Sequence, residues 1–285
     1  MADEKMTIRA VAVGAWRDGF AALTAQRGVS LTTFLALTLI NLVPQLLNPE
    51  AQLAGLKPAA NPPSAAALSA LVQTGSIGLV SALIASLALA PLAIAIHRFI
   101  LLGETTSSYR VELGQRRFRR FAFYTFLLNL IALTPAFFGI FFLATIKLLP
   151  AVAAALLGLG IGVIEIAGAI VLLVLLVRLT LLFPAVAVDA PRAGWNRALD
   201  ESSGHFWRIL SALLLTGLIG ILVFIAAAIV QAMGGFLMLH GHLAPGALVA
   251  GIGRAATSVL MASVFVAAAS LLYRDMAKRQ VAQEA

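Results

Sequence analysis

One acidic residue stands alone in a long apolar segment of the chain, and it is the first candidate for chemistry. Glu165 lies in "GLGIGVIEIAGAIVLL", and Arg254 lies in a second apolar segment, "AGIGRAATS". Ionisable side chains inside a membrane are costly, so they indicate a functional site by default. One interpretation is a proton or solute relay in which Arg254 is the partner of Glu165.

The alternative is a purely structural Glu165, protonated and hydrogen-bonded between helices. Three glycines precede it at Gly158, Gly160 and Gly162. Small residues let membrane helices approach closely, so this pattern favours helix packing at the depth of Glu165.

The other polar constellations are weaker. His240 and His242 form a short H-x-H, but a zinc site needs further ligands. Ser202, His205 and Asp189 lie near one another in sequence, but no G-x-S-x-G nucleophile elbow surrounds the serine. Phosphate-binding and dinucleotide-binding glycine motifs are also missing. The sequence therefore predicts no catalytic residue, no metal, no cofactor and no enzymatic activity.

Composition sets the elements that must position these residues. The chain has 285 residues, of which 61% are hydrophobic and 11% are charged, with a mean hydropathy of +0.99. A soluble domain carries about 25% charged residues, so much of this surface needs lipid as its solvent. Cysteine is absent, which excludes disulfides and thiolate metal sites. Charges interrupt residues 1–27, so we expect no cleavable signal peptide there.

Long uncharged runs predict an all-α, polytopic membrane bundle of six transmembrane helices. A turn is predicted at 233–246, where glycine, histidine and proline gather. Residues 1–27 form a cytoplasmic interfacial helix, 28–274 the six-span domain and 275–285 a cytoplasmic tail. The predicted spans are 28–49, 75–101, 121–146, 150–182, 208–232 and 247–273.

Lys and Arg are distributed very unevenly between the two sides of these spans. The side that carries both termini holds seventeen of them, and the opposite loops hold only Lys57 and Lys147. Cytoplasmic loops are enriched in Lys and Arg, so both termini are predicted in the cytoplasm of a bacterial inner membrane. Topology and anionic headgroups then account for the net charge of +8, and a nucleic-acid partner is not expected.

The six spans form three hairpins, and each hairpin leaves the inner leaflet at an arginine: Arg98, Arg178 or Arg274. One interpretation is that the hairpins repeat a single unit, and the alternative is that any inner-leaflet boundary collects arginine and tryptophan. His97, beside Arg98, is interpreted as an interfacial residue. The predicted intramembrane charged residues are Glu165 and Arg254, and the predicted lipid-contact residues are Arg98, Arg117, Arg178, Trp195, Trp207, Arg208 and Arg274.

The stretch Val177–Leu210 links two spans and is predicted to form an elbow on the membrane surface. Pro184 disfavours continuing the preceding helix. Asp189 ahead of Pro191 is typical of a helix N-cap. Trp195 then begins an apolar stripe on a short helix that lies in the interface plane. A similar stripe at Val13, Trp16, Phe20 and Leu23 marks the N-terminal segment.

The same stretch resembles a bacterial family of six-span membrane proteins, related to the membrane domain of some glycerophosphoryl diester phosphodiesterases. The resemblance implies a helical membrane domain of largely uncharacterised role and no hydrolase. It rests on "RLTLLFPAVAVD" and "ALDESSGHFWRIL", at Arg178, Pro184, Asp189, Ser203, Gly204, Trp207 and Arg208.

Three function classes follow. The first is a non-catalytic integral membrane protein that interacts with lipid or acts as a membrane scaffold, with phospholipids as partners and a second copy or another membrane protein as further candidates. The second is a small-solute transporter or channel subunit that uses Glu165. The third, an intramembrane enzyme, needs several polar side chains at one depth, and the sequence offers one.

Overall fold

The computed structural model describes residues 6–47, 65–106, 108–145, 151–191 and 193–284, and these residues form helices without a strand. The all-α class is thereby confirmed. In chain order the helices are α1 (Ile8–Ala25), α2 (Arg27–Leu47), α4 (Ala65–Leu102), α5 (Arg116–Thr145), α6 (Ala151–Leu179), α7 (Leu182–Ala187), α8 (Trp195–Glu201), α9 (Phe206–Ile219), α10 (Ile221–Leu239) and α11 (Leu243–Glu284).

Five segments of the described residues are long and apolar enough to cross a membrane: Arg27–Leu46, Gly75–Leu102, Leu156–Ala187, Ile221–Leu239 and Leu243–Met276. The architecture therefore fits a multi-pass membrane protein. The predicted third span, 121–146, coincides with α5, but part of that helix lies outside the described side chains. A sixth span stays a prediction.

The predicted fifth span and the turn after it are wrong in detail. Residues 208–232 contain the break between α9 and α10 at Gly220, and α10 continues to Leu239. The turn is confined to residues 240–242, where Gly241 has a φ of 86°. Gly234 and Gly246, which also lie in the predicted turn, instead let α10 and α11 approach closely. A Cβ added at Gly246 would lie 2.5 Å from the Gly234 carbonyl oxygen.

Helix α11 occupies the centre of the fold. It packs against α1, α2, α4, α9 and α10, and its buried side chains contribute to two hydrophobic clusters. It begins before the predicted sixth span, and the tail predicted at 275–285 instead continues the helix to Glu284, with Met276 buried in the core. Consecutive helices also pair, α2 with α4, α5 with α6 and α10 with α11, but repetition among these hairpins stays a prediction.

Helix α1 has two apolar faces. Val13 and Phe20, from the predicted interfacial stripe, are exposed. The opposite face is made of small residues that are buried against α11, and a Cβ added at Gly19 would lie 3.1 Å from the Cα of Val264. The N-terminal helix is therefore part of the core as well as a surface element.

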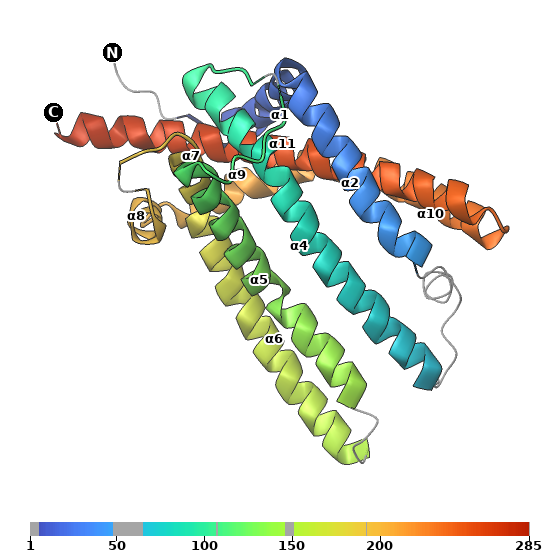
Figure 1. The fold of residues 1–285 in the computed structure, drawn as a ribbon. Helices are drawn as coiled ribbons and strands as arrows, with labels where there is room; N and C mark the ends of the chain where they lie inside the picture. The colour runs from blue at the N-terminus through green and yellow to red at the C-terminus, as the bar shows by residue number, and fades with distance from the viewer. Residues whose placement is uncertain (1–5, 48–64, 107, 146–150, 192, 285) are drawn as a thin grey trace.

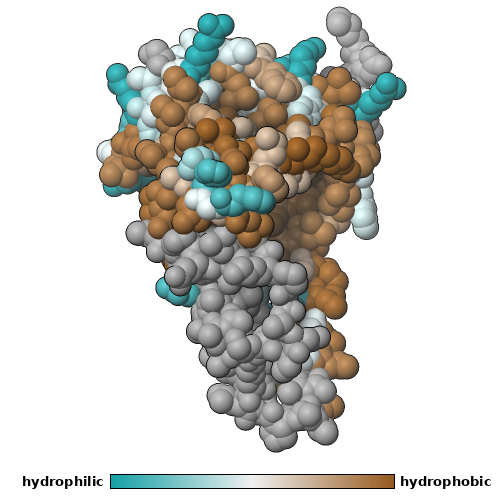
Figure 2. Space-filling model, turned by 90° about the vertical axis from the view of Figure 1, so that its right-hand side faces the viewer, coloured by the Kyte–Doolittle hydropathy of each residue, from teal (hydrophilic) through white to brown (hydrophobic). Residues whose placement is uncertain are grey.

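The helices spread apart from one end of the molecule (Figure 1). Both termini lie at this end, whereas the α5–α6 hairpin and the α10–α11 hairpin extend away from it in different directions. On the face that Figure 2 shows, most hydrophilic side chains project from the upper end of the molecule, and hydrophobic surface covers the flank below. We call the end that carries the termini, Arg98, Arg117 and Arg178 the basic end.

Candidate functional site

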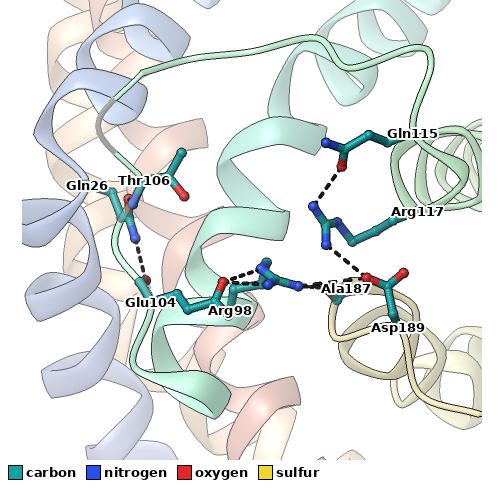
Figure 3. Close-up of polar contacts among 8 residues, drawn as sticks. All are labelled: Gln26, Arg98, Glu104, Thr106, Gln115, Arg117, Ala187 and Asp189. Atoms are coloured by element: carbon teal, nitrogen blue, oxygen red, sulfur yellow. Dashed lines mark hydrogen bonds and ion pairs between the residues drawn. The ribbon is translucent and has the colours of Figure 1, made fainter.

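An ion-pair network joins α4, α5 and the end of α7 at the basic end (Figure 3). Arg98, in the last turns of α4, donates from Nε to Glu104 Oε2 at 2.7 Å. Its Nη1 donates to the Ala187 carbonyl at 3.1 Å and lies 3.9 Å from Asp189 Oδ2. Ala187 is the last residue of α7, so the guanidinium satisfies a carbonyl that has no partner within its own helix.

Asp189 is the acidic centre of this network. Arg117 donates to its Oδ2 at 2.9 Å, and the same guanidinium donates a second hydrogen bond to Gln115 Oε1 at 2.8 Å. The φ of Asp189 is 53°, a left-handed conformation that aspartate tolerates better than most residues. The predicted N-cap role is wrong, because α8 begins at Trp195 with Gly194 as its N-cap. The carboxylate is engaged by arginines instead.

Gln26 fastens the loop after α4 to the corner between α1 and α2. Its side chain is fully buried, and both ends of the amide are used. Nε2 donates to the Glu104 carbonyl at 3.2 Å, and Oε1 accepts from the Thr106 amide at 2.7 Å (Figure 3). A lone glutamine between two helical runs carries no sequence signal for this role, and our sequence reasoning missed it.

Tyr109 fixes the same loop at a second point. Its hydroxyl donates to the Ala88 carbonyl at 3.1 Å. Ala88 lies in the turn before Pro91, next to Leu87, whose carbonyl loses its helical donor because proline has no amide hydrogen. Burial of the phenol raises the pKa of Tyr109 above its ordinary value.

Three arginines from three helices hold the elbow between α6 and α9. Each donates to a backbone carbonyl: Arg98 of α4 to Ala187 at 3.1 Å, Arg120 of α5 to Ala193 at 2.7 Å and Arg178 of α6 to Leu199 at 2.6 Å. Arg178 Nε also contacts Ser202 Oγ at 3.3 Å. The short helices predicted between the two long ones are present, and protein side chains hold them in place; their position on a membrane surface stays a prediction.

Proline does not end the helix as predicted. α6 ends at Leu179, and Pro184 is the third residue of the short helix α7. The first amides of a helix have no acceptor within it, so a residue without an amide hydrogen fits there. In the same elbow, Trp195 is partly buried against a hydrophobic cluster, and Trp207 is 74% exposed.

Arg208 joins the two chain ends to α9. Its Nη2 lies 2.7 Å from both the Met6 carbonyl oxygen and Asp275 Oδ2. Asp275 Oδ1 in turn accepts from the Met6 amide at 3.4 Å. Of the predicted lipid-contact arginines, Arg98, Arg117, Arg178 and Arg208 thus have protein partners, and Arg274 has none among the described residues. Lipid contact at all of them stays a prediction.

The structure does not pair Glu165 with Arg254. Glu165 faces α5, and a Cβ added at Gly139 would lie 3.4 Å from its Oε1. This oxygen is buried without a hydrogen-bond partner in the described part of the chain. Arg254 is exposed on α11 and donates to Gln231 of α10 at 3.2 Å. A Cβ added at Gly160 or Gly162 would meet nothing within 4 Å in the described part of the chain, so neither glycine lies at the close helix contact predicted beside Glu165.

His97 is a buried polar residue that sequence reasoning placed incorrectly at the interface. It is 1% exposed, and its Nδ1 lies 2.7 Å from Ser270 Oγ on α11. Phe121 covers the ring at a centroid distance of 6.1 Å. The histidine therefore links α4 to the central helix within the core.

His240 and His242 lie exposed at the turn between α10 and α11. His240 Nδ1 is 2.9 Å from the Phe236 carbonyl oxygen. The described residues contain no group of three or more His, Asp or Glu side chains that could hold a metal ion.

Comparison of the chain with protein families, curated proteins and solved structures found no match. A function for the chain therefore rests on the geometry of its own residues.

Proposed function

We propose that the chain is a non-catalytic, multi-pass protein of a bacterial inner membrane that acts as a lipid-dependent scaffold. One observation carries this proposal: arginines, among them Arg98, Arg117 and Arg178, gather at the basic end, and the long helices that leave it expose apolar side chains along their flanks. Figure 2 shows hydrophilic side chains mainly at its upper end and largely hydrophobic described surface between and below them. Anionic headgroups attract such a cluster, and hydrocarbon suits the flank below it. Membership in the six-span bacterial family that the stretch Val177–Leu210 resembles is likewise part of this proposal.

The internal contacts of the basic end favour a scaffold over a reactive site. Arg98, Arg117 and Asp189 satisfy one another, and backbone carbonyls take up further guanidinium groups. A fully connected polar network of this kind stabilises one arrangement of loops. Trp207, exposed beside it, fits a side chain that anchors a helix at the headgroup level.

Reconstitution tests this proposal directly. The purified chain is placed in nanodiscs of phosphatidylcholine alone or with phosphatidylglycerol, and thermal unfolding is followed in each. We expect the anionic lipid to raise the Tm by several degrees, and we expect added salt to reduce the gain because it screens exposed charges. Equal Tm values in the two lipids contradict the proposal.

Orientation is tested separately with introduced cysteines. The chain has no native cysteine, so Ser203→Cys at the basic end and His242→Cys at the opposite turn each report one side. We expect an impermeant thiol reagent added to intact cells to label only His242→Cys. Labelling of Ser203→Cys alone reverses the predicted topology.

One observation favours transport as the second candidate. The Oε1 atom of Glu165 is buried without a hydrogen-bond partner in the described residues, which suits a group that exchanges a proton or binds a cation. Liposomes that contain wild-type chain or Glu165→Gln are loaded with a pH-sensitive dye and given a potential. Proton flux that the substitution abolishes supports transport, and equal leakage from both preparations counts against it.

A further inference from the structure

The four arginines at the start of α5 fall into two pairs with different surroundings. Arg117 and Arg120 point to the protein, where they hold Asp189 and the Ala193 carbonyl. Arg116 and Arg119 are exposed, and neither side chain has a hydrogen bond or ion pair within the described part of the chain. Helical geometry causes this separation, because residues three apart lie on one face and adjacent residues do not.

The face that carries Arg116 and Arg119 continues as an apolar stripe. Exposed side chains recur at spacings of three and four residues, the period of one helix face. They are Phe123, Phe126 and Leu130, which are 59%, 40% and 40% exposed. A rise of 1.5 Å per residue places Leu130 about 16 Å beyond Arg119. That length matches one leaflet, half of a hydrocarbon core about 30 Å thick.

We propose that this face of α5 binds one anionic phospholipid from the leaflet at the basic end. Arg116 and Arg119 bind the phosphate, and Phe123, Phe126 and Leu130 contact an acyl chain. The site rests on the proposed lipid dependence and assigns it to named residues. Charge complementarity argues for the headgroup, since guanidinium groups bind phosphate oxygens in bidentate geometry. The exposed apolar stripe, continuous with the cations, argues for a lipid over a soluble acidic ligand.

The test compares three forms of the full chain by native mass spectrometry and by titration with phosphatidylglycerol. They are wild type, Arg116→Gln/Arg119→Gln and the control Arg9→Gln/Arg27→Gln. The control removes the same two charges from exposed positions at the basic end. Direct charge-assisted hydrogen bonds from a guanidinium to phosphate gain roughly tenfold or more in affinity per arginine, so we expect about a hundredfold higher Kd for Arg116→Gln/Arg119→Gln. The control keeps the wild-type Kd. A further variant, Arg116→Lys/Arg119→Lys, gives an intermediate Kd, because lysine keeps the charge but not the bidentate geometry.

Each other result has a definite meaning. Equal phosphatidylglycerol binding by all three forms overturns the site and leaves the lipid-dependent function intact. A wild type that binds phosphatidylglycerol no better than phosphatidylcholine overturns the function as well.

A second pair of measurements tests the acyl-chain contact. We expect Phe123→Ala/Phe126→Ala to weaken phosphatidylglycerol binding, and we expect millimolar inorganic phosphate to leave bound lipid in place. Unchanged binding by this variant, or displacement of the lipid by phosphate, shows a charge-only site and overturns the lipid assignment.

Discussion

The Arg178 guanidinium at the end of α6 donates to the Leu199 carbonyl of α8 at 2.6 Å. Leu199 lies in the last turn of α8, where carbonyls lack partners within the helix and a positive charge is favourable. Arg178 therefore links the last turn of α8 to α6, together with Ser202 Oγ, which donates to the same carbonyl at 3.0 Å.

We expect Arg178→Gln to destabilise the chain by about 1.5–3 kcal/mol, the usual contribution of a hydrogen bond to a charged group. Thermal unfolding in a fixed nanodisc composition measures the loss. Arg274→Gln is the matched control, because Arg274 has no partner among the described residues. Equal losses in the two variants argue against the contact with α8 as the cause.

Gln26→Leu should loosen the loop after α4. The substitution removes the hydrogen bonds to the Glu104 carbonyl and from the Thr106 amide, and each bond contributes about 0.5–1.5 kcal/mol. Hydrogen exchange at residues 104–106 should therefore accelerate. Gln26→Glu keeps the acceptor for Thr106 and should give an intermediate rate; a rate as fast as that of Gln26→Leu speaks against the assigned geometry.

Tyr109→Phe should alter the alkaline limit of stability. Burial raises the pKa of Tyr109 above 10.0, so the folded chain keeps this proton to higher pH than the unfolded chain does. The buried neutral phenol therefore contributes its full stabilisation below pH 10, and this stabilisation is lost as the pH rises through the pKa of the folded state. Tyr109→Phe also loses the hydrogen bond to Ala88, about 0.5–1.5 kcal/mol, at every pH. When the free energy of unfolding is measured from pH 8 to 11, it should fall less steeply with pH for Tyr109→Phe than for the wild type.

Gly246→Ala should disrupt the crossing of α10 and α11. The added Cβ would lie 2.5 Å from the Gly234 carbonyl oxygen, a backbone atom that cannot move independently. Gly160→Ala is the control, since its Cβ meets nothing within 4 Å. Alanine forms helix better than glycine by about 1 kcal/mol, so the control should be neutral or stabilising. We expect the melting temperature of Gly246→Ala to lie below that of the wild type and that of Gly160→Ala to equal or exceed it.

Periodicity and charge predicted the helical class, most of the long apolar segments and the elbow between α6 and α9. Composition alone cannot separate glycines that turn a chain from glycines that let helices cross, and this is why 233–246 was assigned to a turn. Gly234 and Gly246 meet in space although the sequence places them on opposite sides of the turn. Local pattern carries no information about such a contact.

The candidate site was less predictable. The cluster "RRFRRF" identified a basic boundary, but the sequence does not say which face of α5 packs on α7 and the elbow. Arg117 was predicted to contact lipid and binds Asp189, whereas Arg116 and Arg119, which are exposed, were not selected. The same limit applies to Glu165 and Arg254, whose similar placement in apolar runs suggested a pair. Their side chains face α5 and Gln231 of α10.

The central position of α11 has a consequence for biogenesis. Chains are made from the N-terminus, so α1, α2 and α4 leave the ribosome well before the helix that they surround. The arginine clamps wait over shorter separations, because Arg98, Arg120 and Arg178 precede the carbonyls that they hold by 89, 73 and 21 residues. The elbow can therefore assemble as it is synthesised, while the early helices wait for α11. During that interval the small-residue face of α1 and the apolar faces of α2 and α4 are exposed to the insertion machinery, to chaperones and to membrane proteases.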